Sequence, residues 1–217
     1  MKNKYSSVLF SSACLPPVEY FIYLVNSDKI WIENFETYHK QTYRSRYSIY
    51  GANGKLTLSI PVTKISGHNT CIKDIKISYL QNWQNIHWKS IESAYNSSPY
   101  FLFYRDELFP FFDKKFNFLI EYNHRILELL MELIGIKKEV NYTTDFQKRP
   151  LNIIDLRNKI SPKNKISSFN FKPYHQVFEN KSGFIPNLSI IDLLFNEGPN
   201  TENILIIDYL TNGKFEI

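Results

Sequence analysis

The stretch VLFSSACLPPVEYFIYLVNSDKIWIENF, residues 8–35, decides the predicted fold because it reads as a strand, a helix and a second strand. Residues 8–14 form an apolar strand that two prolines end, and prolines suit the first turn of the helix predicted over residues 18–25. Residues 29–35 alternate apolar and polar side chains, a pattern typical of a strand. Two strands joined by a helix at this spacing predict a βαβ unit with a parallel strand pair.

The following segment predicts an antiparallel β-hairpin. Residues 43–50 and 55–62 are strand-like and flank Gly-Ala-Asn-Gly, whose Asn-Gly step tolerates the positive φ angles of a tight turn. Residues 72–78 alternate again, which predicts a further half-exposed strand. These segments add antiparallel pairing to the parallel pair.

From residue 82 onward the apolar spacing becomes helical. A first helix is predicted to end at the Asn-Ser-Ser-Pro of residues 96–99, and Gly135 stands where a helix C-cap belongs. A short strand within residues 137–146 and a long loop with one short helix over residues 149–168 follow. The other helices are predicted over residues 100–112, 118–134 and 188–195.

Together these elements predict the α/β class, with a mixed sheet that combines a parallel core and an antiparallel β-hairpin, packed with helices. The 217 residues, 43% of them hydrophobic, suffice for a single main domain with one substantial core. Residues 1–145 are expected to hold the α/β core with its hairpin and helices. Residues 146–217 are expected to form a C-terminal loop and helix segment that packs on the same domain.

Charge and composition narrow the functional classes. The formal net charge is +5 and the pI about 9.0, but the cations are scattered along the chain, so nucleic acid is not favoured as a partner. A small anionic substrate needs only a few local cations. The two cysteines make neither a disulfide framework nor a zinc site, and the histidines are too far apart in sequence to predict a metal site. No cofactor is indicated.

The location is expected to be the cytoplasm. The apolar run at residues 8–10 falls short of the ~7–15 residues that the core of a secretory leader needs. No segment approaches the ~20 apolar residues of a transmembrane helix. Free thiols in a reducing compartment agree with this expectation.

Arg44 and Arg46 are the first candidate site residues because residues two apart point to the same face of a strand. Guanidinium groups match phosphate and carboxylate geometry, so the pair predicts an anion clamp, with Lys40 just upstream. The alternative is a solvated strand face. Arg157 and Lys163 form a second basic cluster in the predicted long loop, where cations can close over an anionic substrate or be ordinary surface charge.

His87 is the second candidate. It falls near the centre of an apolar helical stripe, so it faces either the core or the floor of a cleft. It is therefore either a satisfied core histidine or a general base at the bottom of a pocket. Glu92 lies about 140° around the same helix, which excludes a direct dyad with His87. If Glu92 is buried, its carboxylate needs a partner, and an ion pair with Arg44 or Arg46 would give it a structural role.

Several stretches resemble the WbqC-like protein family of bacteria, and the resemblance spans nearly the whole chain in the expected order. The most specific are YHKQTYRSRYSIYGANGKLTLSIPV and NWQNIHWKSIESAYNSSPYF. LPPVEYF, YRDELFPFF, DLRNKISPK and GFIPNLSIIDLLFNEGP accompany them. The positions that match the family motif are Lys40, Arg44, Arg46, Gly54, His87, Trp88, Glu92, Tyr95, Arg157, Pro162 and Lys163.

The resemblance implies an enzyme of cell-surface polysaccharide biosynthesis, including lipopolysaccharide O-antigen, that acts on an anionic activated sugar, with a transferase as the usual inference. Lys40, Arg44 and Arg46 would then hold the phosphates of a nucleotide sugar, with Arg157 and Lys163 closing from the loop. His87 would serve as base and Glu92 would orient its neighbours.

A second reading is a non-catalytic module of the same pathway that binds a sugar nucleotide or a partner enzyme. Many relatives open with a His-Gln-Pro where this chain has Ser12, Ala13 and Cys14, which favours the module if that histidine is catalytic. The Asn that is usual between the two arginines is Ser45 here. A nucleic-acid binder is a third reading, and it predicts affinity that falls steeply with salt.

Overall fold

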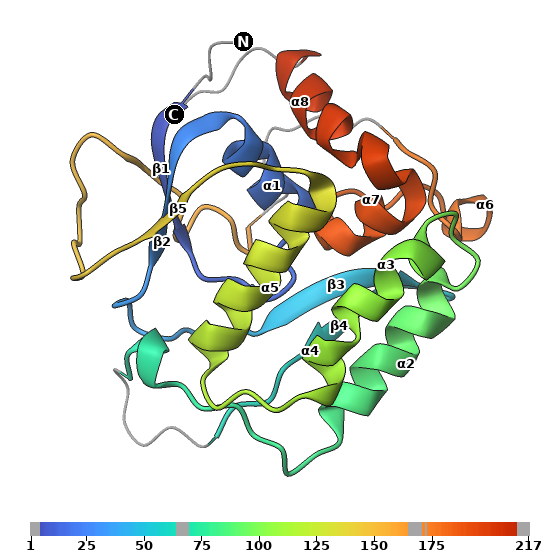
Figure 1. The fold of residues 1–217 in the computed structure, drawn as a ribbon, viewed down its shortest axis with the longest axis horizontal. Coiled ribbons are helices and arrows are strands. Elements are labelled where there is room, and N and C mark those ends of the chain that lie inside the picture. The colour runs from blue at the N-terminus through green and yellow to red at the C-terminus, as the bar shows by residue number, and fades with distance from the viewer. Residues whose placement is uncertain (1–4, 64–69, 165–170, 172, 212–217) are drawn as a thin grey trace.

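The computed structural model describes residues 5–63, 70–164, 171 and 173–211 of the chain (Figure 1). Strand β1 (Tyr5–Ser11), helix α1 (Val18–Val25) and strand β2 (Ser27–Glu33) form the predicted βαβ unit, and the two strands are parallel, with Leu9 opposite Trp31. The α/β class with a parallel core and a β-hairpin is confirmed.

The parallel sheet has the order β5-β2-β1-β6. Strand β5 (Val140–Tyr142) extends it beside β2, within the segment where a short strand is predicted. Strand β6 (Ile154–Asp155) pairs with the other edge of β1, so the segment after residue 145 completes the same sheet. Four parallel strands therefore come from three separate stretches of the chain.

The predicted hairpin forms a two-stranded sheet of its own, with β3 (Arg46–Gly51) antiparallel to β4 (Gly54–Ser59). Gly54 closes the turn with a φ of 98°, a left-handed conformation that glycine adopts without strain. Tyr47 and Ile49 are fully buried, so this sheet packs against the core and not away from it.

The helices follow the predicted apolar faces. The predicted helix over residues 100–112 is interrupted at Phe109, because Pro110 has no N–H to continue the hydrogen bonding. Gly135 has a φ of 91° and ends α5 as predicted. The bounds are α2 (Trp83–Tyr95), α3 (Phe101–Leu108), α4 (Pro110–Asp113), α5 (Leu119–Ile134), α6 (Glu179–Ser182), α7 (Ile190–Glu197) and α8 (Thr201–Thr211), with 3-10 turns η1 (Ile72–Asp74) and η2 (Gly198–Asn200).

Two local predictions are wrong. The strand predicted over residues 72–78 is the 3-10 turn η1, followed by isolated bridges from Lys76 to Phe118 and from Ile77 to Val62. Its alternating isoleucines are buried without a neighbouring strand of the sheet beside them. In the described part of the predicted loop, residues 149–164, the structure has strand β6 in place of a short helix.

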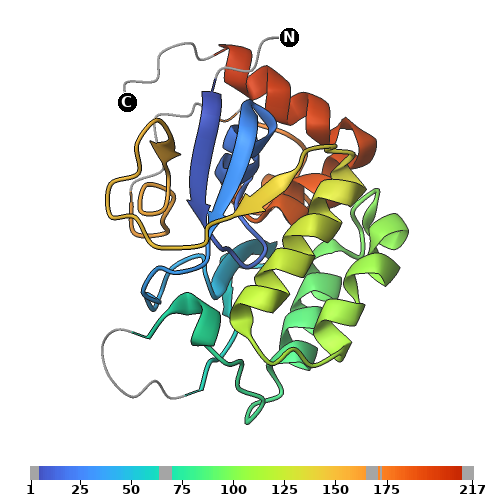
Figure 2. The ribbon, with the colours of Figure 1, turned by 60° about the vertical axis from the view of Figure 1, so that its left-hand side comes forward.

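The parallel sheet separates helices from loop. Helices α1, α5 and α8 lie on one side, and the segment between β5 and β6 curls over the other (Figure 2). Val8, Phe10, Ile30 and Ile32 point to the helical side and are at most 1% exposed. Because a loop covers the side opposite these helices, that side leaves room for cavities beside the sheet. Among the described residues, no helix is long and apolar enough to cross a membrane.

Candidate functional site

The carboxyl ends of β1 and β6 meet at a narrow crevice. The chain runs from β1 to β2 and β5 on one side of β1, then returns to its other side as β6, so the strand order reverses between β1 and β6. In open parallel sheets, ligands bind outside the carboxyl ends of strands at such a switch point. This position makes the crevice the candidate functional site.

Two small cavities that share Tyr43 make up this strand-end crevice. The inner cavity, about 10 Å³, is lined by Ser12, Arg44 and Arg157. The outer cavity, about 40 Å³, is lined by Lys55 and Lys159. The inner volume is about that of a single water molecule, so a phosphate would lie in the outer cavity and the rest of the ligand at its mouth.

Arg44 lies almost wholly inside the protein, with 3% of its surface exposed. Its Nε donates to Glu36 Oε1 at 2.9 Å, and its Nη2 donates to Glu36 Oε2 and, at 2.7 Å, to Ser11 Oγ. Asn123 donates from Nδ2 to the carbonyl oxygen of Arg44 at 2.8 Å and to Ser12 Oγ at 3.2 Å. The residues after β1 and the residues before β3 are therefore fixed to one another.

Arg157 is held in the same way from β6, at 4% exposure. It donates to Asp155 from Nε at 2.9 Å and from Nη2 at 2.7 Å, to Glu33 Oε2 at 2.8 Å and to the Gln147 carbonyl at 2.8 Å. Burial raises the pKa of Asp155, but hydrogen bonds and charge from Arg157 outweigh it and hold that pKa below its ordinary value. Ser11 Oγ donates to the Arg157 carbonyl at 2.8 Å and so joins the two arginines.

These contacts decide which cations can attract a ligand. Arg44 and Arg157 are paired with three carboxylates, those of Glu33, Glu36 and Asp155, so the buried cluster carries no excess positive charge. The outer cavity presents the exposed Lys55 and Lys159 instead, beside the buried Glu19, whose carboxylate accepts from Asn187 at 3.1 Å. Anion attraction at the crevice therefore comes from lysines, with the arginines as a rigid floor.

Tyr43 joins the two cavities and supplies a hydrogen-bond donor. Burial, helped by the charge of Glu19, raises the pKa of Tyr43 to about 12. The phenol is protonated at neutral pH, as an ordinary tyrosine is, and its hydroxyl can donate to a ligand oxygen.

The structure brings Arg44 and Arg157 together but separates the other predicted substrate-binding residues from them. The expectation that Arg44 and Arg46 share a strand face is wrong because β3 begins only at Arg46. Arg46 is half-buried and donates from Nε to Ser59 Oγ at 3.3 Å. Lys40 and Lys163 are exposed, and neither lines the crevice, although Lys163 follows Pro162, which does.

His87 lies in the core, on the buried face of α2. Tyr47 Oη is 3.0 Å from its Nδ1, and the rings of Tyr47 and Trp83 pack edge-on against the imidazole. Burial lowers the pKa of His87 to about 4, against a hydrogen bond to the Ser59 backbone that raises it, so the imidazole is neutral at pH 7. His87 and the half-buried Glu92 line neither cavity of the crevice, and their predicted catalytic roles stay predictions.

Sequence reasoning missed most of the polar residues around the crevice. Glu33 is the last residue of β2 and Glu36 comes three residues later, a placement at the carboxyl end of a buried strand that marks candidate site residues and could have found them. Asp155, which the sequence places beside the basic cluster of Arg157 and Lys163, forms an ion pair with Arg157 two residues away. Lys55 and Lys159 carry no local signal that separates them from other surface lysines.

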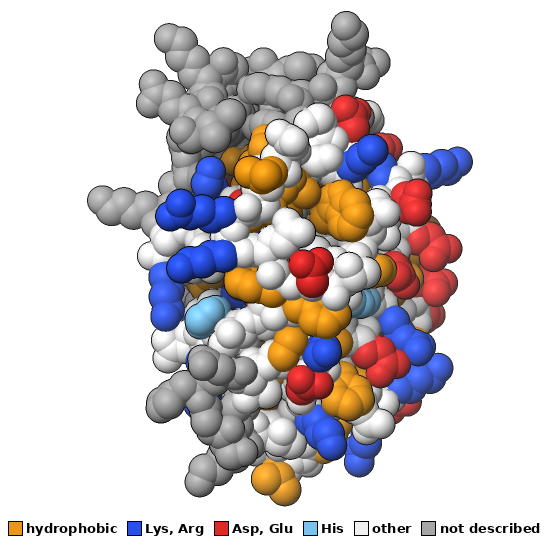
Figure 3. All heavy atoms as spheres, turned by 90° about the vertical axis from the view of Figure 1, so that its left-hand side faces the viewer, with side chains coloured by type: hydrophobic (Ala, Val, Ile, Leu, Met, Phe, Trp, Pro, Cys, Tyr) orange, Lys and Arg blue, Asp and Glu red, His pale blue; other side chains and the backbone are white. Residues whose placement is uncertain are grey.

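Figure 3 views the molecule from the left-hand side of Figure 1, and charge is unevenly distributed over this face. Lys and Arg side chains gather along its left edge, and acidic side chains, with further Lys and Arg, gather along its right edge (Figure 3). Within the described ranges, no cluster of His, Cys, Asp or Glu has the arrangement of a metal site.

Comparison with known proteins adds the family. The chain is 22% identical over 222 residues to a protein of Mycobacterium tuberculosis named Uncharacterized protein Rv1507c, an alignment that covers 91% of this chain and 96% of that one. No solved structure shows significant similarity. The model of the WbqC-like protein family matches residues 12–168 and 158–204, a span that includes the strand-end crevice, the hairpin and α2. The chain therefore belongs to the WbqC-like protein family.

Proposed function

We propose that the strand-end crevice binds an anionic, activated sugar in the biosynthesis of a cell-surface polysaccharide such as O-antigen, and that the protein is a transferase acting on it. The supporting observation is the pair of exposed lysines over a rigid, ion-paired floor, at the point where the strand order of a parallel sheet reverses. The known association of WbqC-like proteins with lipopolysaccharide synthesis supplies the substrate class.

Each residue has a distinct part in this proposal. Lys55 and Lys159 hold the phosphates at the outer cavity, and Lys163 adds positive charge near the mouth. Tyr43 donates to a phosphate oxygen or lies beside the sugar. Arg44 and Arg157 keep the two strand ends in place, since their own charges are already compensated. Lys40 and Arg46 would act only at longer range.

A non-catalytic binding module is the second candidate, and the surroundings of His87 favour it. The Tyr47 hydroxyl lies 3.0 Å from Nδ1 and the Ser59 backbone also hydrogen-bonds the imidazole, and no histidine is among the residues that line the crevice. A transferase built on this crevice would therefore need another base, or a reaction in which the leaving group takes the proton.

Isothermal titration of the purified chain with UDP-glucose, dTDP-glucose and GDP-mannose tests the binding proposal. Lys159→Ala and Lys55→Ala should each weaken binding about tenfold, which corresponds to about 1.4 kcal/mol. The affinity should also fall as salt rises, because exposed charges are screened. Lys89→Ala, which removes an exposed lysine from α2, should bind like the unaltered protein.

Product detection in the same samples separates the two candidates. Turnover with an acceptor glycan supports the transferase, and saturable binding without turnover supports the module. If none of the three nucleotide sugars binds, or if Lys89→Ala weakens binding as much as Lys159→Ala, the assignment of the crevice is wrong.

A further inference from the structure

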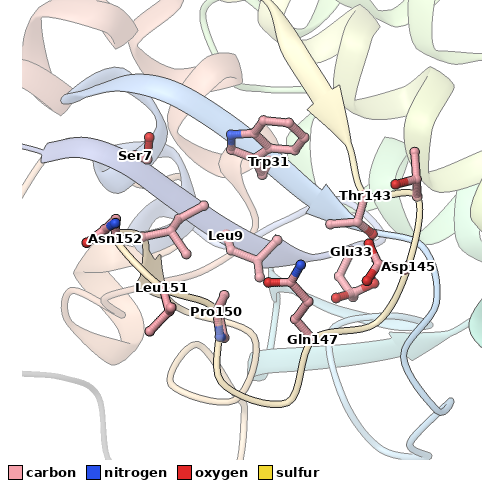
Figure 4. A pocket seen from close by; sticks show the side chains of 12 residues that line it. Ser7, Leu9, Trp31, Glu33, Thr143, Asp145, Gln147, Pro150, Leu151 and Asn152 are labelled. Atoms are coloured by element: carbon pink, nitrogen blue, oxygen red, sulfur yellow. The ribbon is translucent and has the colours of Figure 1, made fainter.

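A second and much larger cavity, of about 390 Å³, lies on the loop-covered side of the parallel sheet. Leu9 of β1 and Trp31 and Glu33 of β2 form its floor, and the segment between β5 and β6 forms its wall, with Gln147 and Leu151 on the opposite side from Trp31 (Figure 4). This volume falls within the range of about 300–1,000 Å³ that is typical of small-molecule sites. We refer to it as the sheet-face cavity.

The lining of the sheet-face cavity combines one aromatic ring, that of Trp31, with hydrogen-bonding side chains, and it contains no cation. None of its lining residues is Lys, Arg or His, and two are carboxylates, Glu33 and Asp145. Within the described chain, the side chains of Asp145, Gln147 and Asn152 have no hydrogen-bond or ion-pair partner. Trp31 is half-buried, with its ring in the floor. Asp145, Gln147 and Asn152 are exposed, so an incoming ligand would replace water at these groups and lie against the Trp31 ring.

The wall of the cavity is held in place by the buried ion pairs. Arg157 donates to the Gln147 carbonyl, and Thr143 Oγ1 donates to Glu33 Oε1 at 2.7 Å, which fixes both ends of this part of the loop to β2. Asn152 adopts a φ of 58°, a left-handed turn just before β6. A wall fixed before binding reduces the entropy that a ligand must overcome.

We propose that the sheet-face cavity binds an uncharged sugar ring. The C–H face of a pyranose carries a slight positive charge, which suits the negative face of the Trp31 ring. Sugar hydroxyls can donate to Asp145 and exchange hydrogen bonds with Gln147 and Asn152, which are the unused groups of the cavity. Among the described residues, Asp145 is a carboxylate without a cationic partner and no lining residue is a cation, which disfavours a phosphate or carboxylate ligand.

This assignment does not rest on the crevice, although one ion pair joins the two sites. Glu33 lines the sheet-face cavity, and Arg157, its ion-pair partner at 2.8 Å, lines the inner cavity of the crevice. An anionic group and an uncharged sugar can therefore be bound on opposite sides of one ion pair. Each site is tested with its own ligand, so one can fail without the other.

Tryptophan fluorescence provides a direct test. The chain has three tryptophans; Trp83 and Trp88 are 3% and 8% exposed, so Trp31 is the one that acrylamide can reach. The methyl glycosides of glucose, galactose, mannose and N-acetylglucosamine, at millimolar concentrations, are the probes. At least one should protect the protein from acrylamide quenching in a saturable way, and glucose 6-phosphate should protect less than methyl glucoside. Trp31→Phe should abolish the quenchable component.

Variants of the wall locate the bound sugar. Asp145→Ala should raise the dissociation constant roughly tenfold and Gln147→Ala roughly threefold to fivefold, in line with the loss of a charged and a neutral acceptor. Asp113→Ala, which removes an exposed carboxylate on α4, is the matched control and should change nothing. The proposal is overturned if no glycoside protects Trp31, if uridine protects while the glycosides do not, or if Asp113→Ala weakens protection equally.

Discussion

A guanidinium inside a protein is stable only where carboxylates and carbonyls replace its hydration. Arg44 meets this need through Glu36, and Arg157 through Glu33 and Asp155. Removal of one partner from such a buried pair costs about 3–5 kcal/mol, because it leaves a charge without compensation. The two arginines are therefore fixed parts of the crevice, and substitutions there would change folding and binding together.

The buried imidazole of His87 predicts a stability that depends on pH. Its pKa is lowered to about 4, below the ordinary value of 6.5, so the folded protein holds it neutral while the unfolded chain takes up a proton below about pH 6.5. This stabilisation is complete above pH 6.5 and is lost as the pH falls towards 4. His124, whose pKa burial also lowers to about 4, adds in the same direction. Urea unfolding at about pH 7.5 and about pH 5 should give a lower free energy of unfolding at the acidic value.

His87→Phe should reduce this pH dependence, leaving the part due to His124. It should also lower the free energy of unfolding at neutral pH by about 1–3 kcal/mol, since the buried Tyr47 hydroxyl loses its partner. His39→Phe, at an exposed position, is the control. If His87→Phe kept the pH dependence in full, the imidazole would not be the group responsible.

Residue types and spacing could identify Arg44 and Arg157 as candidates, but not their partners. Glu33 lies 124 residues from Arg157 in sequence, and no local pattern connects them. The same spacing argument placed Arg46 beside Arg44, and it failed because a strand boundary fell between the two residues. The sequence could not decide between core packing and catalysis for His87, because the two roles differ in the residues around the imidazole, and only the fold brings those residues together.

Elements with strong local signals follow the sequence closely. Helix α1 covers residues 18–25 as predicted, and α5 ends at Gly135. The signals for these bounds are prolines before a helix, helical spacing of apolar residues and a glycine cap, and each acts within a few residues. Strand β6 has only two residues and is stable through its pairing with β1, which is far away in sequence. Residues 72–78 show that alternation alone does not specify a strand without an edge to pair with.

Two glycines at element ends allow a matched test of local strain and packing. Gly54 and Gly198 both have positive φ, at 98° and 53°, so alanine is strained at either site. A Cβ at Gly54 would meet nothing within 4 Å, whereas one at Gly198 would lie 2.5 Å from the Tyr100 ring. In urea unfolding, Gly54→Ala should cost about 1 kcal/mol. Gly198→Ala should cost clearly more, because its φ of 53° with a ψ of −124° suits glycine alone and because Tyr100 must also move. Equal losses would mean that neither this backbone conformation nor Tyr100 limits the position.

At the scale of the molecule, one cluster of ion pairs organises both proposed sites. It joins the end of β1, the end of β2, the segment before the hairpin and the residues after β6. The helices cover one side of the sheet, and the other side is left to a loop that these ion pairs hold.

The segment after residue 145 is expected to fold only as part of the whole. Strand β6 completes the sheet, and α7 packs against α1, α3 and β3. Five apolar side chains of α7 are completely buried, each worth about 1.5–3 kcal/mol, which together equals the typical stability of a domain, about 5–15 kcal/mol. In addition, Asp192 of α7 accepts from Tyr95 at 2.8 Å and from Tyr174 at 2.6 Å, so that truncation would leave Tyr95 without this partner.

A fragment of residues 1–145 should therefore show no cooperative urea transition by circular dichroism or tryptophan fluorescence. A chain of residues 1–211, which keeps all the helices and strands described here, is the control and should unfold at the midpoint of the full chain. Addition of residues 146–217 as a separate peptide should restore a transition in the fragment if the interface alone is missing, since binding to the folded form stabilises it. A fragment 1–145 that unfolds cooperatively at the full-length midpoint would contradict the single core, because β1 would then be stable without β6 beside it.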